Sequence, residues 1–256
     1  MNFIKEGDIT KAIKQKKELS GVVDSLVKDM LEKYIRKHNI SLKNLRAPEI
    51  RIIIKEIRSQ LRNLTGRFQK TQKKRIKLLE KENFKELLKT HTSANERLNF
   101  YPELKKLIQR LGVKSILDLA CGLNPIALAN KNILYYAADI KEDDLKLVKA
   151  YFNKNNIKGS VFAYDLRKIS DNLPQVDLCL LFKILDILEK NTHNIANKII
   201  ENVQSKYFLI SFSTKTLSGK PMKQQRRVWL ERLLDSHHYT YESFSSDNEI
   251  FYLVTK

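Results

Sequence analysis

The sequence has few residues that crosslink or interrupt a chain. Its 256 residues include only two cysteines, five prolines and seven glycines. Two cysteines exclude a disulfide framework, so we expect a fold held by its hydrophobic core in a reducing, cytoplasmic environment. Few prolines and glycines leave little room for flexible linkers. At this length the chain can bury a full core, and we expect one main domain with an extension.

Long apolar runs are also missing. No segment approaches the length that crosses a bilayer, and the residues after Met1 lack the apolar stretch of a signal peptide. No cysteine pair has C-x-x-C spacing, and the neighbouring His237 and His238 cannot share a helix face. We therefore expect no metal and no membrane partner. We also expect a monomer.

Acidic residues are scarce relative to basic ones, and unevenly so. The formal net charge is +19, of which residues 1–110 contribute +15 and residues 111–256 only +4. A concentrated positive charge is typical of a surface that contacts nucleic acid. A solvated, lysine-rich surface explains the composition equally well.

Residues 1–88 have helical periodicity and contain a basic stripe. After Pro48, apolar side chains recur on one face, and Gly66 is the expected helix end: Ile50, Ile53, Ile54, Ile57, Leu61 and Leu64. Four basic residues share the other side at steps of four, three and four: Arg51, Lys55, Arg58 and Arg62. Further basic residues extend this stripe: Arg67, Lys70, Lys73, Lys74, Arg75 and Lys77. We predict a helical, basic, RNA-binding region over residues 1–88, with a solvated helix face as the alternative.

From residue 89 onwards, short apolar strands alternate with helices. Strands are expected at 115–119, 134–139, 161–165, 176–182 and 206–212, followed by a hairpin of 239–244 and 250–255. Five parallel strands and a terminal hairpin predict an α/β fold with a seven-stranded, Rossmann-like sheet over residues 89–256.

The clearest ligand signal is a strand, a tight turn and a helix start within residues 115–127. Asp118 ends the apolar run, Gly122 lies in the turn, and Pro125 opens the helix. The next two strands end in Asp139 and Asp165. Ionised carboxylates accept hydrogen bonds, so such a rim suits the hydroxyl groups of a ribose. Alternatively, these acids only end strands and cap helices.

The order acid-x-small-x-Gly in this turn resembles motif I of class I S-adenosylmethionine-dependent methyltransferases. A dinucleotide site requires Gly or Ala where Pro125 stands, so NAD is disfavoured. The resemblance implies that Asp139 accepts from the ribose hydroxyls and that Asp165 lies beside the adenine amino group. Ala120 departs from the pattern, because most of these enzymes have glycine there, which has more backbone freedom.

Three further segments sharpen this resemblance over about residues 85–256. His91–Leu98, Cys121–Pro125 and Phe208–Lys220 together look like the aminoglycoside-resistance 16S rRNA guanine-N7 methyltransferases, the FmrO/ArmA/Rmt group. The resemblance implies that Arg97 contacts the methionine carboxylate of the cofactor. The candidate residues for S-adenosyl-L-methionine binding are Arg97, Asp118, Ala120, Gly122, Asn124, Asp139, Ile140, Asp165, Leu166 and Phe182.

The residues after the fourth strand bear on the methylated atom. Enzymes that methylate exocyclic amines have an Asp/Asn-Pro-Pro-aromatic motif there, whereas this chain has Phe182-Lys183. Methylation of cytosine C5 needs a nucleophilic cysteine, but Cys179 lies within an apolar strand and is expected in the core. Guanine N7 has an available lone pair and no proton, so positioning suffices. We therefore predict no catalytic acid or base.

This resemblance implies that the substrate is 16S rRNA within the 30S subunit. It also implies that methylation there would confer aminoglycoside resistance. The basic candidates for RNA contact are Arg51, Lys55, Arg58, Arg62, Lys183, Lys215, Lys220, Arg226 and Arg227. Lys183 approaches the target or is merely solvated. Two alternatives remain: a methyltransferase for another RNA position or substrate, and an RNA-binding protein with a degenerate cofactor pocket.

Overall fold

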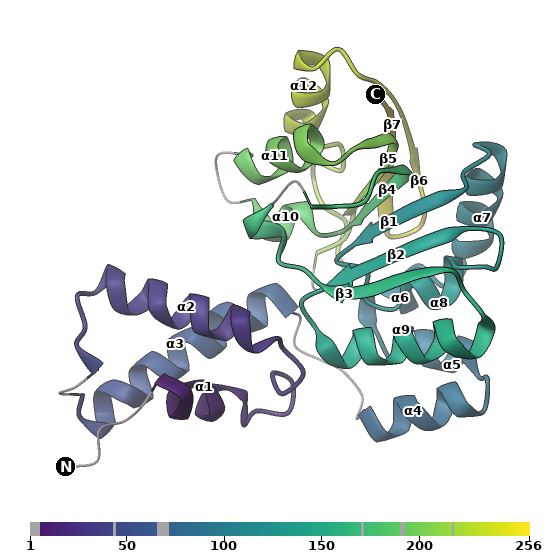
Figure 1. The fold of residues 1–256 in the computed structure, drawn as a ribbon. Helices are drawn as coiled ribbons and strands as arrows, with labels where there is room; N and C mark the ends of the chain where they lie inside the picture. The colour runs from purple at the N-terminus through teal and green to yellow at the C-terminus, as the bar shows by residue number, and fades with distance from the viewer. Residues whose placement is uncertain (1–5, 43–44, 66–71, 170–171, 190–192, 217) are drawn as a thin grey trace.

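The computed structural model describes residues 6–42, 45–65, 72–169, 172–189, 193–216 and 218–256 (Figure 1). Their strands form one seven-stranded sheet in the order β3-β2-β1-β4-β5-β7-β6. The strands are β1 (Ser115–Leu119), β2 (Leu134–Asp139), β3 (Gly159–Ala163), β4 (Val176–Phe182), β5 (Ser205–Ser213), β6 (Thr240–Ser245) and β7 (Glu249–Thr255). The first five are parallel and β7 runs antiparallel to β5, which confirms the predicted sheet.

The third strand lies two residues earlier than predicted. It begins at Gly159, which approaches Tyr135 so closely that an added Cβ would lie 1.9 Å from the Tyr135 carbonyl oxygen. It ends at Ala163, and the Asp165 side chain accepts from the Arg167 amide, which starts the short 3-10 helix η2 (Leu166–Lys168). Asp165 therefore follows the strand instead of ending it.

Helices cover both faces of the sheet, and each face has its own apolar core. One face packs against α4 (Gln72–Glu80), α5 (Phe84–Leu88), α7 (Tyr101–Arg110), α8 (Asn124–Leu128) and α9 (Glu142–Asn155), with α6 (Thr92–Glu96) nearby. The other packs against α10 (Leu185–Leu188), α11 (Asn194–Asn202) and α12 (Val228–Ser236). Cys179 is fully buried, as expected of a core residue.

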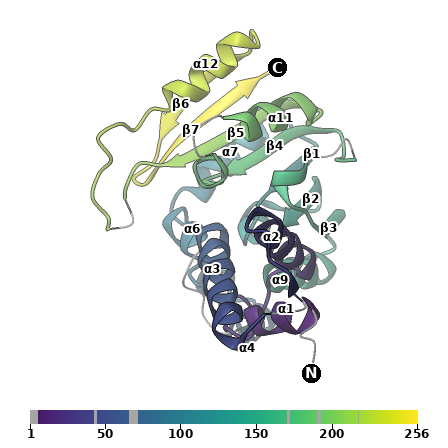
Figure 2. The ribbon, with the colours of Figure 1, turned by 90° about the vertical axis from the view of Figure 1, so that its left-hand side faces the viewer.

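The N-terminal helices form a separate bundle beside the sheet (Figures 1 and 2). The bundle contains α1 (Glu6–Lys14), α2 (Asp24–Lys37) and α3 (Ala47–Thr65), and its apolar core draws on residues 9–61. α4 and α5 instead contribute Leu79, Leu87 and Leu88 to the core of the sheet. The expected region 1–88 thus divides into a bundle and two helices that belong with the sheet.

One member of the extended basic stripe is not on the surface. Arg75 is 1% exposed and pairs at 2.7 Å with Asp144 of α9, while its Nε donates to Thr90 at 3.0 Å. This arginine fixes α4 to α9, which corrects its assignment to an RNA-facing stripe. Gly66, Arg67 and Lys70 lie outside the described residues.

The bundle docks directly on the segment that follows β2. The Val23 amide donates to the Ile140 carbonyl at 3.0 Å, and the Glu142 amide donates to the Gly21 carbonyl at 2.7 Å. These backbone bonds place α2 next to the predicted ribose-binding edge of the sheet.

Candidate cofactor site and RNA-facing residues

The turn after β1 folds back onto the end of β2. Ala120 and Gly122 both adopt left-handed backbone angles, with φ of 56° and 49°. The Gly122 amide donates to Asp139 Oδ2 at 2.9 Å, and the Lys141 amide donates to Asp139 Oδ1 at 3.0 Å. Two of the predicted residues, Gly122 and Asp139, therefore meet at one point, and next to them Ala120 has a left-handed backbone conformation that favours glycine.

Two acids of the predicted site are buried. Burial raises the pKa of Asp118 to about 7, against the effect of the hydrogen bond that Tyr135 donates to its Oδ2 at 2.8 Å. Burial and the nearby Asp144 raise the pKa of Asp139 to about 6. Asp118 Oδ1 is buried without a hydrogen-bond partner. A ligand with a cationic amino group and hydroxyl donors suits such carboxylates, so the residues present fit S-adenosylmethionine.

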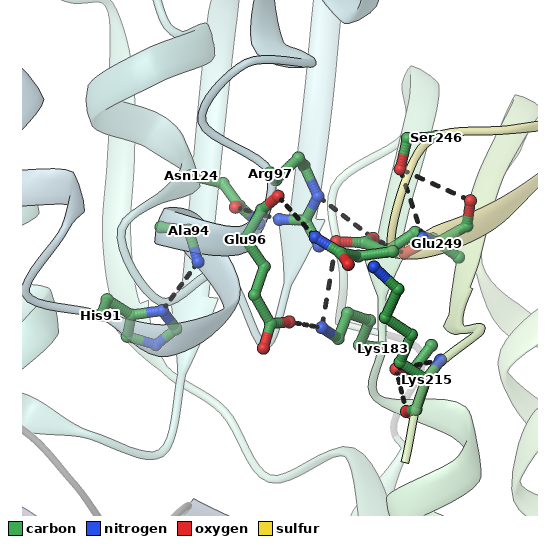
Figure 3. A network of polar contacts seen from close by, with 12 residues as sticks. His91, Ala94, Glu96, Arg97, Asn124, Lys183, Lys215, Ser246 and Glu249 are labelled. Carbon is green, nitrogen blue, oxygen red and sulfur yellow. Dashed lines mark hydrogen bonds and ion pairs between the residues drawn. The ribbon is translucent and has the colours of Figure 1, made fainter. Parts of the chain in front are cut away.

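Arg97 lies at the centre of a buried polar network (Figure 3). Its Nε and Nη2 donate to Glu249 Oε2 at 3.2 and 2.8 Å, and its Nη1 donates to Asn124 Oδ1 at 2.7 Å. The Phe182 ring centroid lies 4.4 Å from the guanidinium carbon. The structure thus brings together three predicted cofactor residues, Arg97, Asn124 and Phe182, at the carboxyl ends of β1 and β4.

Glu249 was not identified from the sequence. It is fully buried at the start of β7, and Ser211 Oγ donates to its Oε2 at 2.7 Å. Lys183 Nζ lies 4.0 Å from its other oxygen, Oε1. The only sequence signal was an acid at the start of an otherwise apolar strand. Its partner Arg97 is 152 residues away, so no local pattern could have paired them.

His91 is a second residue that sequence reasoning left without a role. Its Nδ1 accepts from the Ala94 amide at 3.3 Å and so caps α6. The ring lies against the turn, because a Cβ added to Gly122 would be 2.7 Å from His91 Nε2. Burial lowers the pKa of His91 to about 4, so the ring is neutral at physiological pH.

Asp165 and Leu166 lie beyond the end of β3, near the bundle. Arg167 donates to both Asp165 oxygens, at 2.9 and 2.7 Å, and Leu166 is buried. The Arg167 hydrogen bonds outweigh burial and hold the pKa of Asp165 below its usual value. Asp29 of α2 pairs with Lys168 at 2.7 Å and with Arg167 at 3.5 Å. The predicted adenine edge is thus connected to the N-terminal bundle, and Ile140 connects the bundle to the ribose edge.

Three of the predicted RNA-binding arginines hold the protein together. Arg58 donates to the carbonyls of Ala12 and Ile13 at the end of α1, and Arg62 pairs with Glu18 at 2.8 Å. Arg227 is 8% exposed, and its donors reach Asp186, Ser213 and the carbonyls of residues 224 and 225. These contacts occupy all five of its N–H groups. The three side chains therefore brace the protein, Arg227 from a buried position and Arg58 and Arg62 from partly exposed ones, and their contact with RNA stays a prediction.

The remaining basic candidates lie on accessible surface. Arg51 and Lys55 are exposed on α3, and Lys220 is exposed in the loop after β5, where Lys215 is partly exposed. Arg226 is exposed beside α12, with Glu231 as its 2.8 Å partner. Helical periodicity correctly placed Arg58 and Arg62 on the side of Arg51, but could not show that α1 covers that end of the stripe.

Among the described residues, no helix is long and apolar enough to cross a membrane. The same residues contain no group of three or more His, Cys, Asp or Glu side chains suited to hold a metal ion.

The sheet order and the site at its carboxyl edge define a class I S-adenosylmethionine-dependent methyltransferase. Residues 67–253 match the family model described as ribosomal RNA methyltransferase (FmrO), and the chain belongs to this family. The chain is 28% identical over 187 residues to the 16S rRNA (guanine(1405)-N(7))-methyltransferase of Proteus mirabilis, which covers 69% of this chain and 66% of that protein. Over 179 residues it is 25% identical to the enzyme of the same name from Frankia casuarinae, covering 66% of this chain and 62% of that protein. The chain thus spans about two thirds of the length of these relatives.

Solved structures extend the likeness to the N-terminal bundle. The 16S rRNA methyltransferase RmtF in complex with S-adenosyl-L-homocysteine is 25% identical, with a TM-score of 0.83 over 100% of this chain and 99% of that one. The 16S rRNA methylase RmtB has the same fold at 20% identity, with a TM-score of 0.76 over both full chains. The predicted family and the cofactor, S-adenosylmethionine, are confirmed.

Proposed function

We propose that this protein transfers a methyl group from S-adenosylmethionine to N7 of a guanine in 16S rRNA of the 30S subunit. The observation that carries the proposal is the meeting of the β1 turn, Asp139 and the Arg97 network at one edge of a methyltransferase sheet. Relatives named for this reaction support the choice of substrate. Resistance to aminoglycosides follows as the proposed consequence.

Each part of the site has a proposed role toward the cofactor. Asp139 accepts from the ribose hydroxyls on the side that its two backbone donors leave open. Asp165 and Leu166 border the adenine. Glu249 and Asn124 accept from three of the five N–H groups of Arg97 and so fix its orientation. The guanidinium held in this way binds the methionine carboxylate.

The chemistry requires position more than proton transfer. S-adenosylmethionine supplies an electrophilic methyl group and leaves as S-adenosylhomocysteine. Guanine N7 carries no proton, so no residue of this chain needs to act as a base. Holding both reactants in line lowers the barrier by about 7–11 kcal/mol in well-oriented systems. The rigid, buried setting of Arg97 and Asp139 serves this positioning.

Accessible basic residues are proposed to hold the RNA: Arg51 and Lys55 of the bundle, Lys215 and Lys220 of the loop after β5, and Arg226. They lie on two separate units of the chain. A substrate that contacts both units must present a large folded surface. This supports the assembled 30S subunit over free RNA.

The test is to incubate 30S subunits and naked 16S rRNA with the protein and S-adenosylmethionine. N7-methylguanosine is cleaved after borohydride and aniline treatment, so one new strand break should appear in 16S rRNA, and much faster in 30S subunits. A methyl group on adenine or ribose, with no such break, would refute the guanine-N7 proposal and leave the methyltransferase class intact.

A further inference from the structure

One polar pair beside the cofactor site has no role in the function proposed so far. Lys183 Nζ forms a close ion pair with Glu96 Oε2 (Figure 3). The pair is open to solvent, with side-chain exposures of 17% for Lys183 and 37% for Glu96. The two residues come from distant parts of the chain and meet only in the folded protein.

Backbone geometry fixes both members of the pair. Lys183 follows β4 in a left-handed conformation with φ of 57°, and its amide donates to the Ser211 carbonyl at 2.9 Å. Asn248 Nδ2 donates to the Glu96 carbonyl at 3.4 Å, which ties the end of α6 to the β6–β7 turn. A non-glycine residue in this conformation is uncommon and is often found at functional sites.

The pair also flanks the residues that hold the methionine part of the cofactor in the proposed function. Glu96 precedes Arg97, and Lys183 follows Phe182, whose ring packs on the Arg97 guanidinium. In the proposed function Arg97 holds the methionine part of the cofactor, which carries the reactive methyl group. In the proposed function, the accessible Lys183–Glu96 pair therefore lies next to the base that receives this group.

We propose that Lys183 and Glu96 select guanine as the base to be methylated. Lys183 Nζ donates to guanine O6, and the Glu96 carboxylate accepts from N1–H and the N2 amino group. Adenine has the opposite pattern, with a donor amino group at C6 and an acceptor at N1. Adenine also has an N7, so the choice of base needs such a pair. These contacts leave N7 free to face the methyl group.

The ion pair in the free protein prepares this exchange. In the free protein, Lys183 and Glu96 neutralise each other. When guanine binds, its O6 replaces the Glu96 carboxylate as the acceptor for Lys183, and its N1–H and N2 amino group replace Lys183 as the donors to Glu96. Adenine would separate the charges and leave a donor facing a donor and an acceptor facing an acceptor, and these unpaired groups cost binding free energy. The pair thus rejects the wrong base as well as accepting the right one.

The inference rests on the proposed function, and its test uses the full-length protein with Glu96→Ala and Lys183→Met. The substrates are 30S subunits with guanine or adenine at the position that the unaltered protein methylates. The matched control pair is Glu103 with Lys106, an exposed 2.9 Å ion pair on α7, changed to Glu103→Ala and Lys106→Met. Methyl transfer in single turnover, subunit binding with S-adenosylhomocysteine present, and calorimetric cofactor affinity are measured.

We expect both site variants to lose about ten- to a hundredfold in methyl transfer to guanine. Their preference for guanine over adenine subunits, in transfer rate or in binding, should shrink by a similar factor. Cofactor affinity should stay within twofold, and the control variants should match the unaltered protein. An unchanged guanine preference, or a parallel loss of cofactor affinity, would show that the pair only braces the loop after β4. If the unaltered protein forms no N7-methylguanosine, the proposed function itself fails.

Discussion

At the scale of single residues, the contact between Gly122 and His91 constrains the turn of the cofactor site. Gly122 needs a left-handed backbone and has no room for a Cβ, since His91 Nε2 would lie 2.7 Å away. Gly122→Ala should lower the free energy of unfolding by about 1–3 kcal/mol through strain and overpacking. The displaced turn should also weaken S-adenosylmethionine binding by more than tenfold in calorimetry.

Gly112→Ala is the matched control for this prediction. Gly112 has a similar φ of 66°, but nothing lies within 4 Å of an added Cβ. The control should show the backbone cost alone and keep full cofactor affinity. If both variants behave alike, the His91 contact has no role in forming the turn.

Asp118 should give the cofactor-free protein an unusual dependence on pH. Its folded pKa of about 7 is above the unfolded value near 3.9, so the folded state binds more protons between these values. Stability should therefore fall as pH rises through this window, by up to about 1.4 kcal/mol per pH unit from this group. Asp139 acts in the same direction, whereas His91, with its lowered pKa, opposes both below pH 6.5.

Comparison with Asp118→Asn isolates this contribution. Between pH 5 and pH 8, the free energy of unfolding measured in urea should fall more steeply with rising pH in the unaltered protein than in the variant. Tyr135, Arg97 and Asp139 surround this carboxyl group and are the same in both proteins. Equal slopes would contradict the raised pKa of Asp118.

At the scale of elements, the basic stripe of α3 divides into an exposed part and a part that is bound within the bundle. Arg51 and Lys55 are exposed, whereas Arg58 and Arg62 are bound to α1 and the segment after it. Replacing Arg51 and Lys55 with Gln should weaken 30S binding and lower its log–log salt slope by about one unit per lost phosphate contact. The free energy of unfolding should hardly change.

The complementary variant, Arg58→Gln with Arg62→Gln, should behave in the opposite way. Loss of the Arg58 bonds to the α1 carbonyls and of the Arg62–Glu18 pair should cost stability, measured by urea unfolding. If the first pair of changes leaves the salt slope unaltered, the exposed part of the stripe is only solvated.

Elements also show what the sequence could and could not predict. Three strands have the predicted bounds, because uninterrupted apolar runs bounded by turns are strong local signals. The β3 shift depended on the approach of Gly159 to Tyr135, and the burial of Arg75 depended on Asp144 from another helix. Motif I located the turn, but the Arg97–Glu249 pair joins residues that only the fold brings together. Local sequence patterns predict helices and strands, but they do not predict ion pairs between residues that are distant in the sequence.

At the scale of the whole molecule, the bundle and the cofactor site share a boundary. Backbone bonds join Val23 to Ile140 and Glu142 to Gly21, directly after the ribose-binding candidate Asp139. Asp29 joins α2 to the segment after Asp165. A ligand that orders these edges should therefore also stabilise the docked bundle, because binding to one conformation shifts the population toward it.

Hydrogen exchange provides the measurement of this linkage. Adding S-adenosylhomocysteine should slow exchange at the amides of Val23 and Glu142, which make the docking bonds. Asp29→Asn removes the pairing with Lys168 and Arg167, so it should speed exchange at these amides and weaken cofactor binding by a few-fold. Asp24→Asn is the matched control on the same helix, since Asp24 pairs with Lys14 inside the bundle. If the cofactor leaves the docking amides unchanged, the bundle and the site are independent units. If the cofactor protects these amides in the unaltered protein but not in Asp29→Asn, the linkage between the site and the bundle runs through Asp29.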